Sequence, residues 1–483
     1  MTGADVLVVG GGPAGLTAAL SVARAGNSVT LVESTDQLGG MSASRTVAGI
    51  RVDLGSHRLH PVASDRVERL LQELLGNDLQ VRPRNGRLRL LDSWVRFPLS
   101  PTDLVRALPP RFAVAAMCDT LTGPLRRRRG AADRPNGETF ASVVADGLGP
   151  TMLDSFYGPY AQKLWGRAPD EIAADVARRR IAASSPSRLL AKVARAAKRE
   201  PIVFRYPQLG YGQVTDRLVE SCHEAGVTIV TSTRITSIDV SSPTPAVTLA
   251  SSGGVAAEAS AEAPGADTTS TSRRWDRVLW SAPLPALITA VQHPPSPAPT
   301  VDIRHRAMVL AYLVFDGQPI TSFDAHYLPG LDDAATRVSE PRNYRDGPDP
   351  TDRTVLCAEI PCFVGDDTWN SAPADLGERV LDDLHRLGVT DRRHCDVHAE
   401  YLPHVYPVIG PGDVDPIERA QAWGHALPGV TVFGRQGLTV ADNLHHVMEM
   451  SLAAASRLGD DGVWDHDGWQ RDLAMFATHV VED

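Results

Sequence analysis

Three glycines near the start of the chain have the spacing that a dinucleotide-binding turn requires. In the stretch VLVVGGGPAGLTAALSVARAGNSVTLVE, Gly10 permits a tight turn, Gly12 lets backbone approach a pyrophosphate, and Gly15 allows a helix to lie close to the preceding strand. A second apolar run ends at Glu33, whose carboxylate can accept hydrogen bonds from a ribose and would repel a 2′-phosphate. This order predicts a dinucleotide site that disfavours NADP; the plainer alternative is a βαβ unit with a glycine-rich turn and no ligand.

A second glycine pair, Gly39 and Gly40, follows where a returning loop could contact the pyrophosphate again. With this pair, the chain resembles the FAD-binding flavoproteins of the amine oxidase and protoporphyrinogen oxidase superfamily, although Met41 stands where that family usually has arginine. The resemblance implies FAD as the cofactor. It also implies an α/β fold, α+β overall, in which a Rossmann-like FAD-binding domain with a parallel sheet is interleaved with a mixed sheet-and-helix substrate domain.

Further motifs resemble the branch of that superfamily that contains the UDP-galactopyranose mutases and a large set of flavin oxidoreductases. In FGRQG, Arg435 replaces the acidic residue that many relatives carry, and arginine there is typical of the branch. Six more motifs that resemble this branch occur in order along nearly the whole chain: DLGSHRLHP, YAQKLWGRAPDEIAADVARRRI, RVSEPRNY, VLCAEIPC, HVYPVIGPG and DNLHHVM.

The resemblance implies that several separated segments bind the cofactor. The expected cofactor-binding residues are Gly10, Gly12, Pro13, Ala14, Gly15, Glu33, Ser34, Gly39, Gly40, Met41, Ser56, His57, Ile235, Gly434, Arg435, Asp442, Asn443 and Leu444. The expected domains are an FAD-binding domain over residues 1–60, 205–290 and 395–458, a substrate-binding domain over 61–204 and 291–394, and a C-terminal tail over 459–483.

The stretch GSHRLH fits two kinds of chemistry. The mutases have a Gly-x-His-x-x-His pattern near the flavin, which Gly55, His57 and His60 reproduce. The oxidoreductases usually read glycine, histidine, arginine and two aromatics, which matches His57 and Arg58 but leaves His60 unexplained. A third interpretation is that His57 is a core histidine hydrogen-bonded to backbone.

Two arginines stand where the mutases hold a diphosphate, a leaving group that needs fixed cations. One is Arg306; the other is Arg179 or Arg180, with Arg180 preferred, and the alternative for this arginine run is a charged helix surface. Among the aromatic residues, Tyr406 in VYPV lies just before the last segment of the chain that is expected to reach the flavin. The candidate catalytic residues are therefore His57, His60, Arg180, Arg306 and Tyr406.

Bulk properties exclude several classes of protein. A chain of 483 residues is too long for one core, and a formal charge of −10 argues against nucleic acid as the main partner. Five scattered cysteines have neither metal-ligand nor disulfide spacing, so we expect no metal site and a cytoplasmic protein. No run approaches the ~18 apolar residues of a membrane helix. The expected partner is a small molecule, such as a sugar nucleotide or natural-product intermediate, bound by a monomer or homodimer.

Two reactions fit these residues. The favoured hypothesis is an FAD-dependent oxidoreductase, an oxidase or dehydrogenase that transfers a hydride from a small molecule to flavin N5. The alternative is a non-redox sugar-nucleotide mutase that uses reduced FAD as a nucleophile. A third hypothesis, a flavoprotein that has lost catalysis and serves as a binding partner, is disfavoured because idle polar residues are costly to bury.

Overall fold

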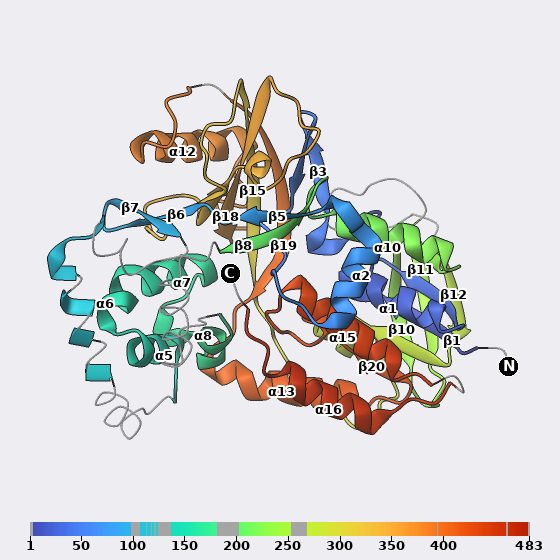
Figure 1. Cartoon of the computed structure of the whole chain (residues 1–483). Helices are drawn as coiled ribbons and strands as arrows, with labels where there is room; N and C mark the ends of the chain where they lie inside the picture. The colour runs from blue at the N-terminus through green and yellow to red at the C-terminus, as the bar shows by residue number, and fades with distance from the viewer. Residues whose placement is uncertain are drawn as a thin grey trace.

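Five short strands form a parallel sheet in the order β20-β13-β1-β2-β9. They are β1 (Asp5–Val9), β2 (Ser28–Val32), β9 (Thr228–Val230), β13 (Arg277–Trp280) and β20 (Val430–Val432). Strands from the beginning, middle and end of the chain therefore lie side by side (Figure 1). The computed structural model describes residues 3–97, 107–112, 114–116, 118–119, 122–123, 137–180, 202–252, 268–393, 395–459 and 462–481.

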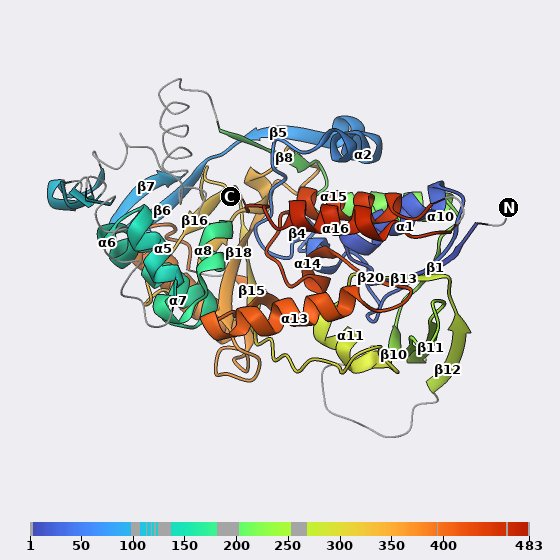
Figure 2. The ribbon, with the colours of Figure 1, turned by 90° about the horizontal axis from the view of Figure 1, so that it is seen from below.

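Both faces of this parallel sheet are covered, as its uninterrupted apolar strands require. On one face lie α1 (Pro13–Arg24), α10 (Gln213–Glu224) and α15 (Leu444–Ser456), as Figure 2 shows. The other face carries α11 (Leu284–Ala290) and a second sheet, β12-β11-β10-β14. Its strands are β10 (Thr233–Asp239), β11 (Ala246–Ser252), β12 (Thr268–Arg274) and β14 (Val291–Gln292).

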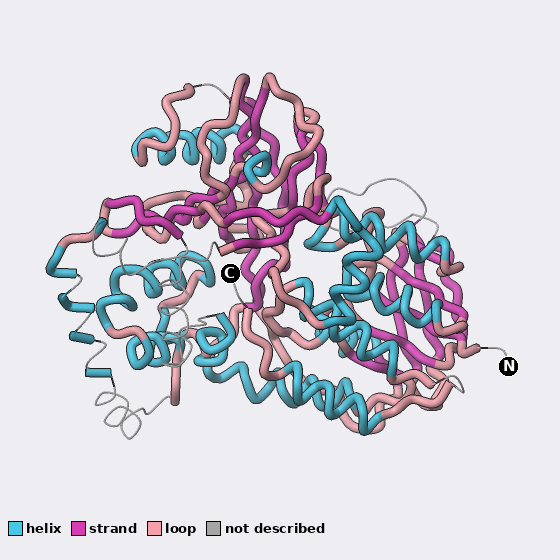
Figure 3. Tube along the Cα trace, viewed as in Figure 1, coloured by secondary structure: helices cyan, strands magenta, loops and turns pink. Residues whose placement is uncertain are grey.

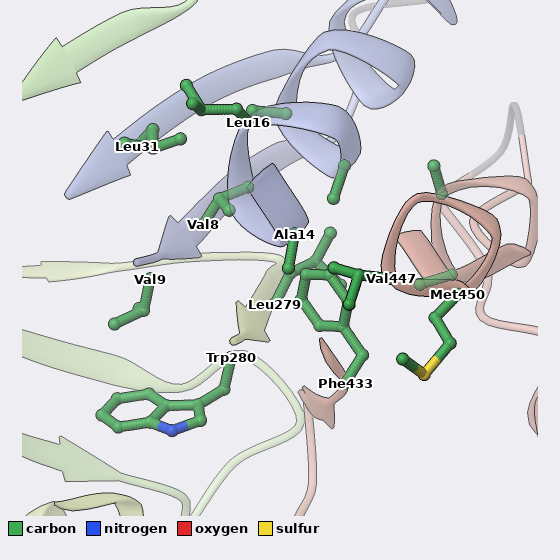
Figure 4. Close-up of a cluster of buried hydrophobic side chains, with 14 of the residues drawn as sticks. Val8, Val9, Ala14, Leu16, Leu31, Leu279, Trp280, Phe433, Val447 and Met450 are labelled. Atoms are coloured by element: carbon green, nitrogen blue, oxygen red, sulfur yellow. The ribbon is translucent and has the colours of Figure 1, made fainter. Parts of the chain in front are cut away.

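The core of this half forms where β1, α1 and α15 meet. Figure 4 shows Leu279 and Val447 close to the ring of Phe433, with Val8 and Leu16 in the same cluster of buried side chains. Val8, Leu16, Leu279 and Phe433 are at most 1% exposed. Burial of each such side chain stabilises the folded state by about 1.5–3 kcal/mol. This packing fixes the N-terminus of α1 at the edge of the sheet where the first turn lies.

A seven-stranded sheet forms the other half, with the order β19-β15-β18-β17-β16-β6-β7. Its strands are β6 (Gly86–Leu90), β7 (Ser93–Phe97), β15 (His305–Asp316), β16 (Ala325–Tyr327), β17 (Arg337–Ser339), β18 (Arg353–Cys362) and β19 (Asp396–Pro407). Side chains alternate along β15: Val309 and Ala311 pack in the core beneath α12 (Pro373–Arg386), whereas Met308 and Leu310 belong to the core on the opposite face.

That opposite face of the seven-stranded sheet is covered by a helical layer, visible at lower left in Figure 3. The layer comprises α5 (Phe140–Gly147), α6 (Pro150–Met152), a π-helical turn (Leu153–Tyr157), α7 (Gly158–Trp165) and α8 (Ala174–Arg180). The remaining elements are β3 (Ser44–Val47), β4 (Ile50–Asp53), α2 (Asp65–Leu75), β5 (Leu79–Pro83), β8 (Val203–Pro207), α13 (Val414–His425), α14 (Gly434–Gly437) and α16 (His466–Phe476). Among the described residues, no helix is both long and apolar enough to cross a membrane.

The predicted α/β fold is confirmed, and three segments lie elsewhere than the expected division would place them. β19 falls within 395–458, yet it pairs with β15 in the seven-stranded sheet. α2 falls within 61–204, yet Leu71 is buried in the core of the parallel sheet. α16 falls in the expected tail, and its Trp469 is buried in that same core. Backbone pairing and apolar burial, which the glycine motifs do not report, decide these placements.

Candidate functional site

A cavity of about 800 Å³ lies at the carboxyl ends of β1, β2 and β13. This edge of an open parallel sheet is where ligands generally bind. Met308 and Leu310 of β15 form part of the opposite wall, and Tyr160 of α7 lies in the helical layer beside them. The cavity therefore lies between the two sheets and is lined by segments from most of the chain.

The first turn presents bare backbone to this cavity. Gly10 has φ of +107°, which favours glycine, and a Cβ on Gly15 would lie 1.8 Å from the Gly10 carbonyl oxygen. A Cβ on Gly12, in contrast, would have no heavy atom within 4 Å, because Gly12 faces the cavity. Pro13 occupies the first turn of α1, so unpaired N–H groups and the positive end of the helix dipole meet the cavity.

The acid at the end of β2 is held by the neighbouring backbone. Glu33 Oε2 accepts a hydrogen bond from the Gly11 N–H at 2.8 Å, and Oε1 accepts one from the Thr35 N–H at 2.9 Å. The second glycine pair lies against the first turn: the Gly39 N–H donates to the Gly11 carbonyl at 2.8 Å. A Cβ on Gly40 would lie 3.4 Å from the Gly12 Cα. Both glycine motifs thus shape one surface for a diphosphate.

Most residues expected at the cofactor line the cavity. They are Gly10, Gly12, Pro13, Ala14, Glu33, Ser34, Gly40, Met41, Ser56, His57, Ile235, Arg435, Asp442, Asn443 and Leu444. Gly15, Gly39 and Gly434 support the wall from behind, with a Cβ on Gly434 falling 3.0 Å from the Ala14 Cβ. The open helix N-terminus, the fixed acid and the size of the cavity fit a flavin dinucleotide.

His57 lies in the cavity wall in a buried setting. Its ring stacks on Tyr211, with centroids 4.8 Å apart and planes 19° apart, and Nδ1 has no hydrogen-bond partner within the described chain. Burial lowers the pKa of His57 to about 3, and the positive charges of Arg337, Arg435 and Arg58 act in the same direction. The imidazole is therefore neutral at physiological pH.

The loop that carries His57 is held by a buried ion pair that sequence reasoning missed. Glu359 Oε1 accepts the Ser56 N–H at 2.7 Å and the Arg337 Nε–H at 3.0 Å, and Oε2 accepts from Arg337 Nη2 at 2.9 Å. Both charged side chains line the cavity and are 6–13% exposed. The available signal was Glu359 itself, the lone acid in the apolar strand VLCAEIPC.

Arg58 turns away to a second buried pair. Its Nη2 donates to Asp324 Oδ1 at 3.1 Å and to the Tyr344 hydroxyl at 3.0 Å, while its guanidinium lies 4.9 Å from the Tyr344 ring centroid. Its charge is thus already neutralised.

Arg180, at the end of α8, lies in the cavity wall above Tyr406 of β19. Its guanidinium carbon is 4.6 Å from the Tyr406 ring centroid, and that of Arg435 is 5.9 Å from the same ring. Arg435 also donates from Nη2 to the Val405 carbonyl at 3.0 Å. Arg178 instead forms exposed ion pairs with Glu138 and Asp175. Within the described chain, no carboxylate forms an ion pair with Arg180 or Arg435.

Two expected catalytic residues lie outside the wall of the described cavity. His60 stacks on His445 with ring centroids 5.2 Å apart, and its Nδ1 is 2.7 Å from the Val62 carbonyl. Arg306 packs on Phe363 at 4.3 Å and donates to the Pro361 carbonyl at 3.2 Å. A register shift between Arg306 and Met308 breaks the alternation that points Met308 into the cavity.

Comparison of the sequence with known proteins identifies the family of this chain. The sequence model of the family described as flavin containing amine oxidoreductase matches residues 13–399. Putrescine oxidase of Kocuria rosea is 41% identical over 83 residues, which are 17% of each chain, so only that share of the relative is matched.

Two solved structures share the fold at low sequence identity. A reduced UDP-galactopyranose mutase superposes with a TM-score of 0.75 at 17% identity, covering 95% of this chain and 94% of the other. A CLA-producing fatty acid isomerase from P. acnes gives 0.60 at 15% identity over 95% and 99% of the two chains. The chain therefore belongs to the flavin containing amine oxidoreductase family, a family of flavin-dependent oxidoreductases, and FAD is its cofactor.

Proposed function

We propose that this flavin-dependent oxidoreductase removes a hydride from a small molecule that carries an anionic group. The observation that carries the proposal is Arg180, a cavity cation without a carboxylate partner in the described chain. By contrast, Arg337 and Arg58 are each paired with a buried carboxylate. A cation left unpaired in a substrate cavity is suited to bind a carboxylate or phosphate.

The rest of the wall around Arg180 suits an apolar carbon frame. The apolar side chains beside it are Leu164, Met308, Leu310, Leu402 and Val405. Of the three carboxylates in the described wall, Glu33 binds backbone N–H groups, Glu359 is paired with Arg337, and Asp442 lies beside His446 and His479. Beside Arg180, a diamine would therefore meet a cation without a carboxylate partner, which disfavours a diamine as the substrate.

The roles of the protein groups follow from their positions. Bound FAD supplies the redox chemistry, because its flavin ring accepts the hydride. Arg180 and Tyr406 hold the anionic end of the substrate, and the apolar wall excludes water from its reacting carbon. His57 is neutral and fixed by stacking on Tyr211, so it offers shape and hydrogen bonding without charge. Arg435, in the turn after β20, remains assigned to the cofactor.

The alternative reaction, a flavin-dependent sugar-nucleotide mutase, needs several cations for its diphosphate leaving group. Arg306 was expected to provide one of these cations, and its packing on Phe363 weighs against that role.

The proposal also places the protein in a reducing compartment, since all five cysteines are free thiols.

The test compares Arg180→Met with Arg178→Met, which removes a neighbouring exposed arginine. FAD-loaded proteins are mixed without oxygen with unsaturated or alkyl carboxylic acids, amines and UDP-sugars, and flavin bleaching is followed. We expect carboxylic acids to bleach wild-type flavin. Arg180→Met should retain FAD but lower kcat/KM by about 10- to 150-fold, because the lost hydrogen bond to a charged group contributes about 1.5–3 kcal/mol. Arg178→Met should match the wild type.

Two results would overturn the proposal. If amines bleach the flavin and Arg180→Met reacts as fast as the wild type, the anionic substrate class is wrong. If turnover of a UDP-sugar requires prior reduction with dithionite and gives an isomeric product, the mutase reaction replaces hydride transfer.

A further inference from the structure

A cluster of imidazoles and one carboxylate lies at the border of the main cavity, where α15 meets the segment after α16, and its carboxylate, Asp442, lines that cavity. Asp442 precedes α15, His446 lies in its first turn, and His479 follows α16. Each residue offers one ligand atom, and these atoms all lie within 4.8 Å of one another. No metal site was expected from the sequence, since the cysteines lack metal-ligand spacing, and these three residues are brought together only by the fold.

The carboxylate in this cluster is buried and incompletely satisfied. The Asp442 side chain is 1% exposed, and its Oδ1 has no hydrogen-bond partner in the described chain. Oδ2 lies 3.4 Å from His479 Nδ1, and Oδ1 lies 3.8 Å from His446 Nδ1, which also lacks a hydrogen-bond partner there. No described lysine or arginine forms an ion pair with Asp442. A buried carboxylate in this situation is stabilised by a cation.

We propose that Asp442, His446 and His479 bind a divalent first-row transition-metal ion. Two imidazoles and a carboxylate are a ligand set that zinc and ferrous iron share. Metal–ligand distances of about 2.0–2.1 Å place tetrahedral ligand atoms about 3.4 Å apart, which is the separation of Asp442 Oδ2 from His479 Nδ1. The fourth position is left for water.

Binding requires one movement of the side chains. The rings of His446 and His479 are nearly parallel, with planes 17° apart and centroids 4.2 Å apart, so both nitrogens cannot yet point at one ion. Rotation of one ring about its Cβ–Cγ bond corrects this, and that torsion has a broad energy profile. A second cavity of about 480 Å³, lined by Asp442, His425 and His466, gives the ion a route to the cluster.

The ion would fasten the C-terminal segment across the cavity. Two residues after His479, the Val481 N–H donates to the Arg179 carbonyl at 2.7 Å, and Val481 lines the main cavity. A metal bond at His479 would thus join α15 to the segment that contacts α8, beside Arg180. The proposal is independent of the substrate proposed above.

The test measures metal binding by FAD-loaded protein without a polyhistidine tag. After dialysis against Zn²⁺ or, without oxygen, Fe²⁺, metal content is determined by mass spectrometry, and Co²⁺ is titrated to record its absorption spectrum. We expect one ion per chain and a Co²⁺ spectrum of imidazole coordination. His479→Gln should weaken binding about 100-fold or more, whereas His223→Gln, which changes an exposed histidine in the last turn of α10, should not alter it.

A second measurement separates metal binding from misfolding. Limited proteolysis after Phe476 should slow when Zn²⁺ is added to wild type and should be unaffected by Zn²⁺ in His479→Gln, whose flavin spectrum should match the wild type. The proposal is wrong if wild type binds no Zn²⁺ or Fe²⁺ after dialysis. It is equally wrong if His479→Gln and His446→Gln both retain the ion with unchanged affinity.

Discussion

At the scale of single residues, we expect the largest loss of stability when the Glu359–Arg337 pair is broken. Glu359→Gln removes the charge that neutralises Arg337 and weakens the acceptor of the Ser56 N–H. Because the guanidinium would remain buried without a counter-charge, the free energy of unfolding should fall by about 3–5 kcal/mol. Urea unfolding of the FAD-saturated protein measures this change.

The matched control is Glu400→Gln, which breaks the Arg45–Glu400 pair. These two side chains are 28% and 35% exposed, so the loss should be within about 1 kcal/mol. Equal destabilisation by the two variants would contradict the importance given to burial.

The sequence predicted residues whose role depends on backbone geometry better than residues whose role depends on partners. Gly10 and Glu33, which were expected to bind the cofactor, both line the cavity, because their spacing follows from one strand-turn-helix-strand unit. Arg306 was expected there too, but a register shift in β15 directs it to Phe363. Arg337 was not singled out, since its partner Glu359 stands 22 residues away.

At the scale of elements, the turn between β1 and α1 separates two functions of glycine. Gly12→Val should give a folded protein that purifies without flavin, because its side chain would enter the cavity and meet no protein atom within 4 Å of Cβ. Gly15→Val should instead destabilise even the FAD-free protein, because its Cβ would lie 1.8 Å from the Gly10 carbonyl oxygen. Flavin absorbance and urea unfolding of the FAD-free proteins distinguish the two.

If Gly12→Val loses as much stability as Gly15→Val, the prediction that Gly12 faces an open cavity is wrong.

The parallel sheet around this turn could be predicted from the apolar runs in the sequence, whereas the pairing of β19 with β15 could not. Contacts between distant strands depend on chain topology, which local periodicity does not encode.

At the scale of the whole molecule, FAD should bind without a covalent bond and stabilise the joined halves. No cysteine lies in the described cavity wall. Acid denaturation should therefore release all of the yellow flavin into the supernatant, and flavin that stays with the pellet would contradict this. At a free FAD concentration of about 1,000 times Kd, the cofactor should add about 4 kcal/mol to the free energy of unfolding, measured against FAD-free protein.

The parallel sheet also sets the order of events on the ribosome. β1 ends at Val9 and β20 begins at Val430, 421 residues later, so translation at about 5–20 residues per second separates them by roughly 20–80 s. Once β13 (Arg277–Trp280) has been made, its edge stays unpaired until β20 follows, and the turn that contains Arg435 does not yet exist. The nascent chain therefore exposes this strand edge before the cavity is complete, and FAD can contact the whole cavity wall only after Arg435 and the residues that follow it have been made.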